Sequence, residues 1–254
     1  MSADSDRREQ RAGSLHCGVA RRVAARVRIA LIGVACALGP LATPAATQHI
    51  REHPLVGITG HWTASDDSGP TLTVDGTQWS GSTDSATLAR ISTQLFGRVD
   101  ADFLRNGQAA GAFPIAVVPA ITRFSSGTLR VRFRLRGGAS DQNAGILFGL
   151  QPDGSYYYVR YNTKDGDLAL WAYADGARRN IAHGDTKQQL PLSTWQTLEV
   201  RIDGAQLTAH VPANNELRFA HTLDAVPTGR VGVWVKRDAI TSFQRFEAEP
   251  TRAP

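Results

Sequence analysis

The segment TLRVRFRLR (Thr128–Arg136) alternates without a break between apolar residues and arginines. Successive side chains of a β-strand point to opposite faces of its sheet, so this pattern predicts a strand with one apolar and one basic face. The apolar face carries positions 129, 131, 133 and 135, and the basic face carries the arginines at 130, 132, 134 and 136. Such a strand belongs to a sheet that covers a core on one side only.

Similar alternations recur along the chain and are separated by turn-forming residues. Asp-Gly pairs, which favour tight hairpin turns, begin at positions 153, 165 and 175, between successive predicted strands. Many short strands with no helical segments between them predict an all-β protein, a two-sheet antiparallel β-sandwich of the jelly-roll type. The further predicted strands are Thr71–Val74, Phe113–Val118, Ala144–Gln151, Ser155–Asn162, Asp167–Ala174, Thr194–Ile202, Gln206–Val211, Glu216–His221, Arg230–Lys236 and Ser242–Ala248.

One segment fits two patterns. Ala86–Thr93 suits a strand in this β-rich context, and that is the interpretation we prefer. However, Leu88, Ile91 and Leu95 are also spaced as on one face of a helix, which Asp84 would cap. The polar, Gly-rich residues 96–112 predict a long surface loop.

The N-terminal 45 residues differ from the rest of the chain. Seven arginines precede the apolar run Ile29–Ala42, and Thr43-Pro44-Ala45 follows it. A basic start, a short apolar run and a small-residue exit are typical of a secretory signal peptide. The run is shorter than the roughly 20 residues of a membrane span. The sequence predicts cleavage after Ala45 and a secreted or periplasmic protein. The alternatives are a twin-arginine signal at Arg21-Arg22, a lipoprotein signal at Cys36 and an uncleaved anchor.

Removal of residues 1–45 changes the charge of the protein. The whole chain has a net charge of +5, but this segment holds seven of its 28 basic and three of its 23 acidic residues. The remaining 21 basic and 20 acidic residues indicate no nucleic-acid partner, and no membrane span remains after cleavage. Cys17 and Cys36 lie in the same segment, which excludes a disulfide scaffold. We expect a linker over 46–60, one β-sandwich domain over 61–249 and a tail over 250–254.

Four stretches of the expected domain resemble a secreted bacterial branch of the concanavalin A-like lectin/glucanase superfamily. Within it, they are most similar to the LamG-like domains grouped with 3-keto-disaccharide hydrolases. The resemblance implies the jelly-roll fold and a glycoside or glycan ligand. This chain departs from the branch at Gly149, where relatives carry Arg, and at Gln244-Arg245, where they carry an acidic pair. The stretches are TLRVRFRLRGGASDQNAGILFGLQ (128–151), PDGSYYYVRYNTKDGDLALW (152–171), STWQTLEVRIDGAQLTAHV (193–211) and GRVGVWVKRDAITSFQRFEAE (229–249).

A glucanase of this superfamily would use two neighbouring glutamates on one strand. No Glu-x-Asp-x-x-Glu pattern occurs, and Glu247 and Glu249 stand at the end of the last predicted strand. The sequence therefore identifies no catalytic residue and favours a protein without enzymatic activity. If the protein is an enzyme, it is a hydrolase or lyase that acts on glycosides.

Strand alternation places aromatic and polar side chains together on three predicted strands. If their outward faces belong to one curved sheet, they form a shallow trough. Aromatic rings stack on the C–H faces of sugars, while Arg, Asn and Lys side chains bond to hydroxyl groups. The alternative is that the aromatic rings pack beneath the loop at 96–112. The predicted carbohydrate-binding residues are Tyr156, Tyr158, Arg160, Asn162, Trp171, Tyr173, Trp234 and Lys236.

Other candidates are weaker. The four arginines of Thr128–Arg136 fit either an acidic polysaccharide or pairing with acids on adjacent strands. Trp195 leads an amphipathic strand, which predicts a core position. Asp165 and Asp167 could ligate Ca²⁺, although a hairpin turn also explains Asp165-Gly166, so we predict no cofactor. The only histidines that suit a metal or base, His183, His210 and His221, lack metal-ligand spacing.

Three functions stay open. The favoured one is an exported, non-catalytic, lectin-like module that binds a carbohydrate or glycoconjugate. The alternatives are a glycoside-cleaving enzyme of the 3-keto-disaccharide hydrolase type and a structural or adhesive envelope protein. The sequence leaves the sugar and the oligomeric state open.

Overall fold

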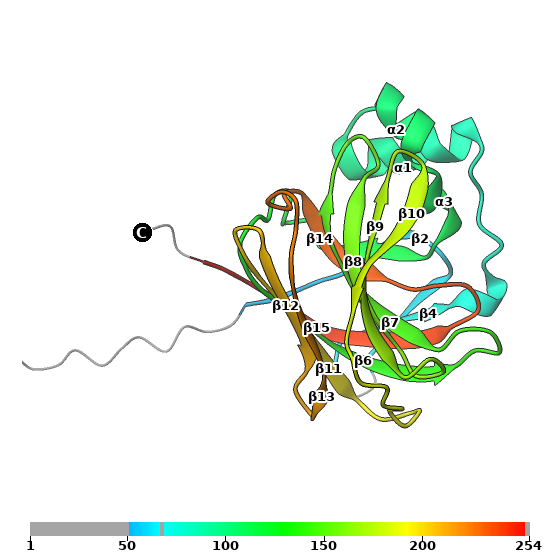
Figure 1. Cartoon of the computed structure of the whole chain (residues 1–254). Helices are drawn as coiled ribbons and strands as arrows, with labels where there is room; N and C mark the ends of the chain where they lie inside the picture. Colours follow the sequence, from blue (N-terminus) through cyan, green and yellow to red (C-terminus); the bar gives the residue numbers. More distant parts are fainter. Residues whose placement is uncertain (1–50, 67–68, 252–254) are drawn as a thin grey trace, which may run out of the picture. The chain divides into compact units, whose positions relative to one another are not determined.

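The computed structural model describes residues 51–66 and 69–251, which form two antiparallel β-sheets (Figure 1). The predicted signal peptide lies outside the described residues. The eight-stranded sheet has the order β13 (Asn214–Thr222), β12 (Gln206–Val211), β11 (Gln196–Asp203), β6 (Gly127–Gly137), β15 (Ile240–Pro250), β4 (Thr71–Asp75) and β3 (Trp62–Ser65), with β1 (Glu52–His53) on β15. The seven-stranded sheet has the order β10 (Ala177–His183), β9 (Asp167–Ala174), β8 (Tyr156–Asn162), β7 (Asn143–Leu150), β14 (Arg230–Trp234), β5 (Ile115–Val117) and β2 (Val56–Thr59).

The two sheets face each other across one apolar core, which confirms the predicted all-β sandwich. On β6, the apolar positions of the alternation are fully buried and the arginines lie on the outer face. Val231, Val233 and Val235 point into the same core from β14 and the residues that follow it. Burial of this inner face supplies the main stabilisation of a domain that has no disulfide among its described residues.

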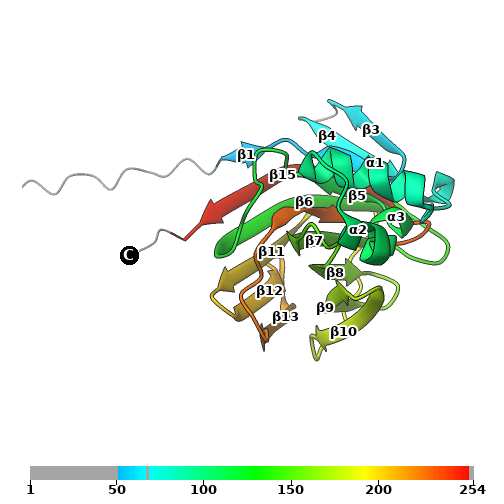
Figure 2. The same ribbon diagram turned by 90° about the horizontal axis from the view of Figure 1, so that it is seen from above.

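The seven-stranded sheet is buried on both faces. Every residue of β7 is buried, because alternate side chains enter two different apolar clusters. The inner set packs in the core between the sheets, and the outer set packs against side chains of three helices. These helices lie over the seven-stranded sheet (Figure 2). The helices are α1 (Ser85–Phe96), α2 (Ala101–Asn106) and α3 (Gln108–Ala112).

These helices correct two sequence predictions. The strand preferred for Ala86–Thr93 is wrong, and the helical alternative is confirmed, because Asp84 caps α1 by accepting a hydrogen bond from the backbone N–H of Thr87. Leu88, Ile91 and Leu95 form the buried face of α1. The surface loop expected over 96–112 contains α2 and α3 instead, and Phe103 on α2 is fully buried.

Short segments at the start of the domain also join the sheets. Residues 52–59, which the sequence places in a linker, form β1 and β2, and Ile58 and Thr59 of β2 are buried. A short 3-10 helix, η1 (Gly76–Gln78), follows β4. Within the described part of the chain, no helix is long and apolar enough to span a membrane.

Candidate functional site

The outer face of the seven-stranded sheet brings together all eight predicted carbohydrate-binding residues. The register pairs Tyr158 with Trp171 and Asn162 with Asp167 across β8 and β9. Gly145 on β7 lies between Arg160 and Trp234 in the same row. The predicted alignment of these faces is therefore confirmed, and their role in sugar binding stays a prediction.

The aromatic half of this face is closed. Tyr156, Tyr158, Tyr173 and Trp234 are at most 7 % exposed and belong to the apolar cluster under the helices. The rings of Tyr158 and Trp234 are stacked with 3.9 Å between their centroids. Burial raises the pKa of Tyr158 to about 12, although the nearby Arg178 acts in the opposite direction. These four side chains lie beneath α1–α3. The alternative interpretation, in which the aromatic rings pack beneath residues 96–112, is therefore confirmed for them, and α1 adds to this cover.

Trp171 marks the border of the closed half. Its ring is partly buried and stacks beside that of Tyr158, with an angle of 7° between the ring planes. The guanidinium carbon of Arg178, on β10, lies 3.8 Å from the centre of the Trp171 ring. Nε of Arg178 also donates to the hydroxyl of Tyr158 at 2.6 Å. Arg178, which the sequence analysis missed, therefore holds the one partly exposed aromatic ring of the predicted set in place.

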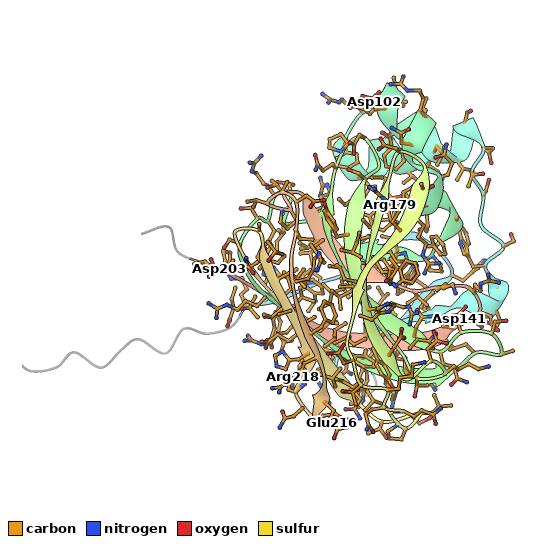
Figure 3. All side chains as sticks on the ribbon, viewed as in Figure 1. Asp102, Asp141, Arg179, Asp203, Glu216 and Arg218 are labelled. Atoms are coloured by element: carbon orange, nitrogen blue, oxygen red, sulfur yellow. The ribbon has the colours of Figure 1, made fainter. Side chains whose placement is uncertain are left out.

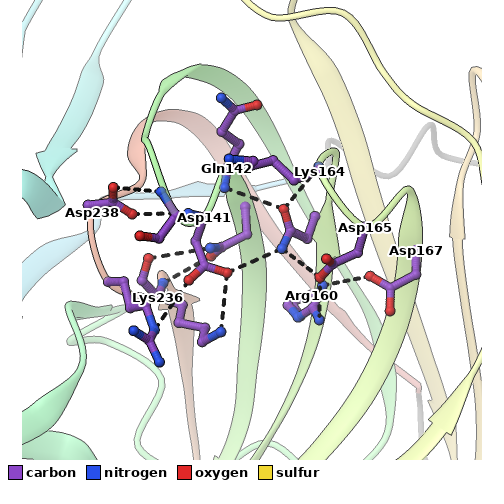
Figure 4. A network of polar contacts seen from close by, with 12 residues as sticks. Asp141, Gln142, Arg160, Lys164, Asp165, Asp167, Lys236 and Asp238 are labelled. Carbon is purple, nitrogen blue, oxygen red and sulfur yellow. Dashed lines mark hydrogen bonds and ion pairs between the residues drawn. The ribbon is translucent and has the colours of Figure 1, made fainter.

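Beyond Trp171, the same face continues as a polar network (Figure 4). Arg160 donates to Asp167 at 2.7 Å and to Asp165 at 3.2 Å. The side-chain amide of Asn162 donates to Asp165 at 2.8 Å and to Asp141 at 3.3 Å. The carboxylates on β9 and in the β8–β9 turn are thus neutralised by a guanidinium that is itself only 6 % exposed.

The second cation of the network is Lys236. Its Nζ donates to Asp141 at 3.2 Å, and its backbone N–H donates to the side chain of Asn143 at 2.9 Å. The side chain of Lys236 is 19 % exposed, compared with 6 % for that of Arg160. Lys236 is therefore held in place by a carboxylate and a backbone hydrogen bond.

Asp238 fixes the loop that carries Asp141. Its carboxylate accepts hydrogen bonds from the backbone N–H groups of Ala139, Ser140 and Asp141 at 2.7–3.0 Å. Although desolvation acts in the opposite direction, these bonds lower the pKa of Asp238. The loop between β6 and β7 is thereby attached to the residues after β14. The sequence gives no local signal for this contact, because its members lie about a hundred positions apart.

A cleft of about 490 Å³ borders the network at Gln142 and Lys164. Its other walls come from the segment before β11, including Leu190, Pro191 and Leu192. The volume is within the range of small-molecule sites, and the lining combines apolar carbon with amide and ammonium groups. The cleft meets the network through Gln142 and Lys164, whose backbone N–H groups both donate to the side chain of Asn162.

Metal candidates do not converge. Asp165 and Asp167 bind the guanidinium of Arg160, and no group of three or more His, Cys, Asp or Glu side chains among the described residues could hold a metal ion. His210 lies 3.9 Å from Glu199 on the other sheet, away from the network.

Similarity to known proteins is found among solved structures. No family model and no curated protein matches the chain. Among solved structures, the carbohydrate-binding module CBM66 from Bacillus subtilis is similar at 13% identity with a TM-score of 0.54, over 78% of this chain and 96% of that one. A Bacillus licheniformis beta-glucanase is 10% identical over 55% of this chain and 71% of its own, with a TM-score of 0.39. The similarity to the binding module shows a shared fold alone, and the predicted two-sheet antiparallel β-sandwich of the jelly-roll type is confirmed.

Proposed function

We propose that this protein is an exported, non-catalytic carbohydrate-binding module of the lectin type. The observation that carries the proposal is the polar network that continues the aromatic face beyond Trp171. Arg160 and Lys236 are held there by carboxylates before any ligand arrives, and the guanidinium carbon of Arg160 lies 5.9 Å from the centre of the partly exposed Trp171 ring. Gln142 and Lys164 connect the network to an open cleft. Fixed donors and acceptors next to an aromatic ring suit the hydroxyls and C–H faces of a sugar.

The position of the glutamates supports the absence of catalysis. All five glutamates of the described residues lie in strands of the eight-stranded sheet, namely Glu52, Glu199, Glu216, Glu247 and Glu249. None of these five forms a hydrogen bond or ion pair with Arg160, Lys236 or the aspartates of the network; the partners of their side chains are Arg130, His210, Arg245 and Gln188. The aspartates on that face are paired with Arg160 or Lys236, whereas glycoside hydrolysis needs one carboxyl group that can donate a proton.

A glycan array on the purified protein tests the proposal, followed by titration calorimetry with the best glycan. We expect Trp171→Ala and Lys236→Met each to weaken binding about tenfold or more, since each removes a central contact. Trp79→Ala is the matched control for Trp171→Ala, because it also removes a partly buried tryptophan ring. Trp79 follows η1, and its ring contacts that of His61 instead of a residue of the network. Circular dichroism checks that each variant is folded, and Lys236→Met replaces a side chain outside the apolar clusters.

The alternatives give different results. An absence of binding to every glycan at high protein concentration overturns the proposal and favours a structural envelope role. Release of sugar from glucosides or 3-keto-glucosides, abolished by Asp167→Asn, favours the hydrolase alternative.

A further inference from the structure

The arginines of β6 on the outer face of the eight-stranded sheet differ in their interaction partners. Arg130 forms ion pairs with Glu199 and with Glu249, the latter at 3.0 Å. Arg132 and Arg134, two and four positions further along the same face, form no hydrogen bond or ion pair with any described residue. Pairing with acids on adjacent strands therefore explains only the first of these arginines.

The residues directly opposite the two unpaired arginines in the register with β11 and β15 carry no charge. Across β11, Thr197 lies opposite Arg132, and across β15, Gln244 and Ser242 lie opposite Arg132 and Arg134. Hydroxyl and amide groups leave the positive charge of both guanidinium groups uncompensated at these facing positions. Because Cα atoms two residues apart on a strand are about 7 Å from each other, the two charges also repel.

Trp195 supports both groups. The predicted core position of Trp195 is wrong: its ring is partly buried on the outer face and belongs to neither apolar cluster. The guanidinium carbons of Arg132 and Arg134 lie 5.2 Å and 4.7 Å from the ring centre. A guanidinium over a ring keeps its in-plane N–H groups available, and Nε of Arg134 is buried without a hydrogen-bond acceptor.

We propose that Arg132, Arg134 and Trp195 form a second binding site, which takes the carboxylate or sulfate groups of an acidic polysaccharide. Planar oxyanions match the bidentate geometry of arginine. The exposed Arg136 extends the row along the same strand. The arginines thus repeat about every 7 Å, which suits a linear chain with regularly spaced charges better than a single small anion. This site lies on the opposite sheet from the network and does not depend on the function proposed for it.

Binding to immobilised sodium polygalacturonate and to dextran sulfate tests this site and separates carboxylate from sulfate recognition. We expect binding to at least one polymer, weaker at about 200 mM than at about 50 mM salt because exposed charges are screened. Arg132→Gln with Arg134→Gln should lower the affinity about tenfold or more, since two charge-assisted contacts are lost. The control is Arg179→Gln, an exposed arginine on β10 (Figure 3), which should change the affinity less than about twofold.

Arg132→Lys with Arg134→Lys keeps both charges and decides the question if the glutamine variant does not fold. We expect it to lower polygalacturonate or dextran sulfate binding about threefold or more, because lysine lacks the planar fork. The proposal is overturned if neither polymer binds, if Arg179→Gln is as damaging as the double variant, if the lysine variant binds like the original protein, or if single-stranded DNA of equal charge binds more tightly than both polymers.

Discussion

The pairing of Arg160 with two carboxylates of different exposure leads to a quantitative prediction. Asp167 is 16 % exposed and lies 2.7 Å from the guanidinium, whereas Asp165 is 52 % exposed and lies 3.2 Å from it. At an effective dielectric constant of about 20, the attraction at 2.7 Å is about 6 kcal/mol before desolvation is subtracted. Because desolvation of a buried pair offsets most of this attraction, we expect Asp167→Asn to lower the free energy of unfolding by about 2–3 kcal/mol.

Asp165→Asn is the matched control, since it alters the same guanidinium from a solvent-exposed position. An exposed ion pair contributes about 0–1 kcal/mol, so this variant should unfold almost like the original protein. Urea unfolding at pH 7 measures both variants, and with a slope of about 2 kcal/mol per molar the midpoint for Asp167→Asn should fall by about 1 M. Equal losses in the two variants, or a loss below about 0.5 kcal/mol for Asp167→Asn, would refute the assignment of Arg160 to a buried pair.

Three further substitutions test the helices and the eight-stranded sheet. Hydrogen bonds from Ser82 and Thr87 lower the pKa of Asp84 from 3.8 to about 2. Asp84→Ala should therefore lower the Tm at pH 7, and the difference from the original protein should shrink as the pH falls from about 4 to 2. An equal loss at all pH values would contradict the role of the ionised Asp84 as the cap of α1. Ile91→Ala removes a fully buried side chain of α1 and should lower the unfolding free energy in urea by about 2–5 kcal/mol, whereas a loss below about 1 kcal/mol would show that α1 is not packed on the sheet. Burial raises the pKa of Glu247, so the ionised carboxylate destabilises the folded protein relative to the unfolded chain at neutral pH. Glu247→Gln should therefore raise the Tm at pH 7 and leave it unchanged at pH 3. A lower Tm at pH 7 would contradict this.

The strands could be predicted because their signal is local. Alternation with a period of two, bounded by turn residues, located β6, β8, β9 and β12 to within about one residue. β10 was not predicted, because it lies at the edge of its sheet, where its exposed side chains show no alternation. For α1, the strand was preferred over the helix because the apolar spacing of this segment fits both, and only its packing on the seven-stranded sheet decides between the two.

The candidate site was predicted in part. The alternation of apolar and polar residues indicates which side chains of a strand share a face, so the sequence could predict that Tyr158 and Trp171 lie on the same face of their strands. Which part of that face is covered depends on α1–α3, whose contacts with the sheet are distant along the chain. Asp141 was missed for the same reason, since its partner Lys236 is 95 positions away. Local periodicity thus predicts the orientation of a side chain, while its exposure depends on segments elsewhere in the sequence.

The two proposed sites make one joint prediction, because they lie on the outer faces of different sheets. The network around Arg160 has its cations neutralised by aspartates, so it suits hydroxyl groups, whereas Arg132 and Arg134 suit oxyanions. A neutral glycan and an acidic polysaccharide should therefore bind simultaneously. Saturation with the best neutral glycan should leave the affinity for polygalacturonate or dextran sulfate unchanged within about twofold, since separate sites without a shared conformational change are not coupled. Competition between the two ligands would show instead that one face binds both, and Lys236→Met and Arg132→Gln would then identify that face by which of them abolishes both interactions.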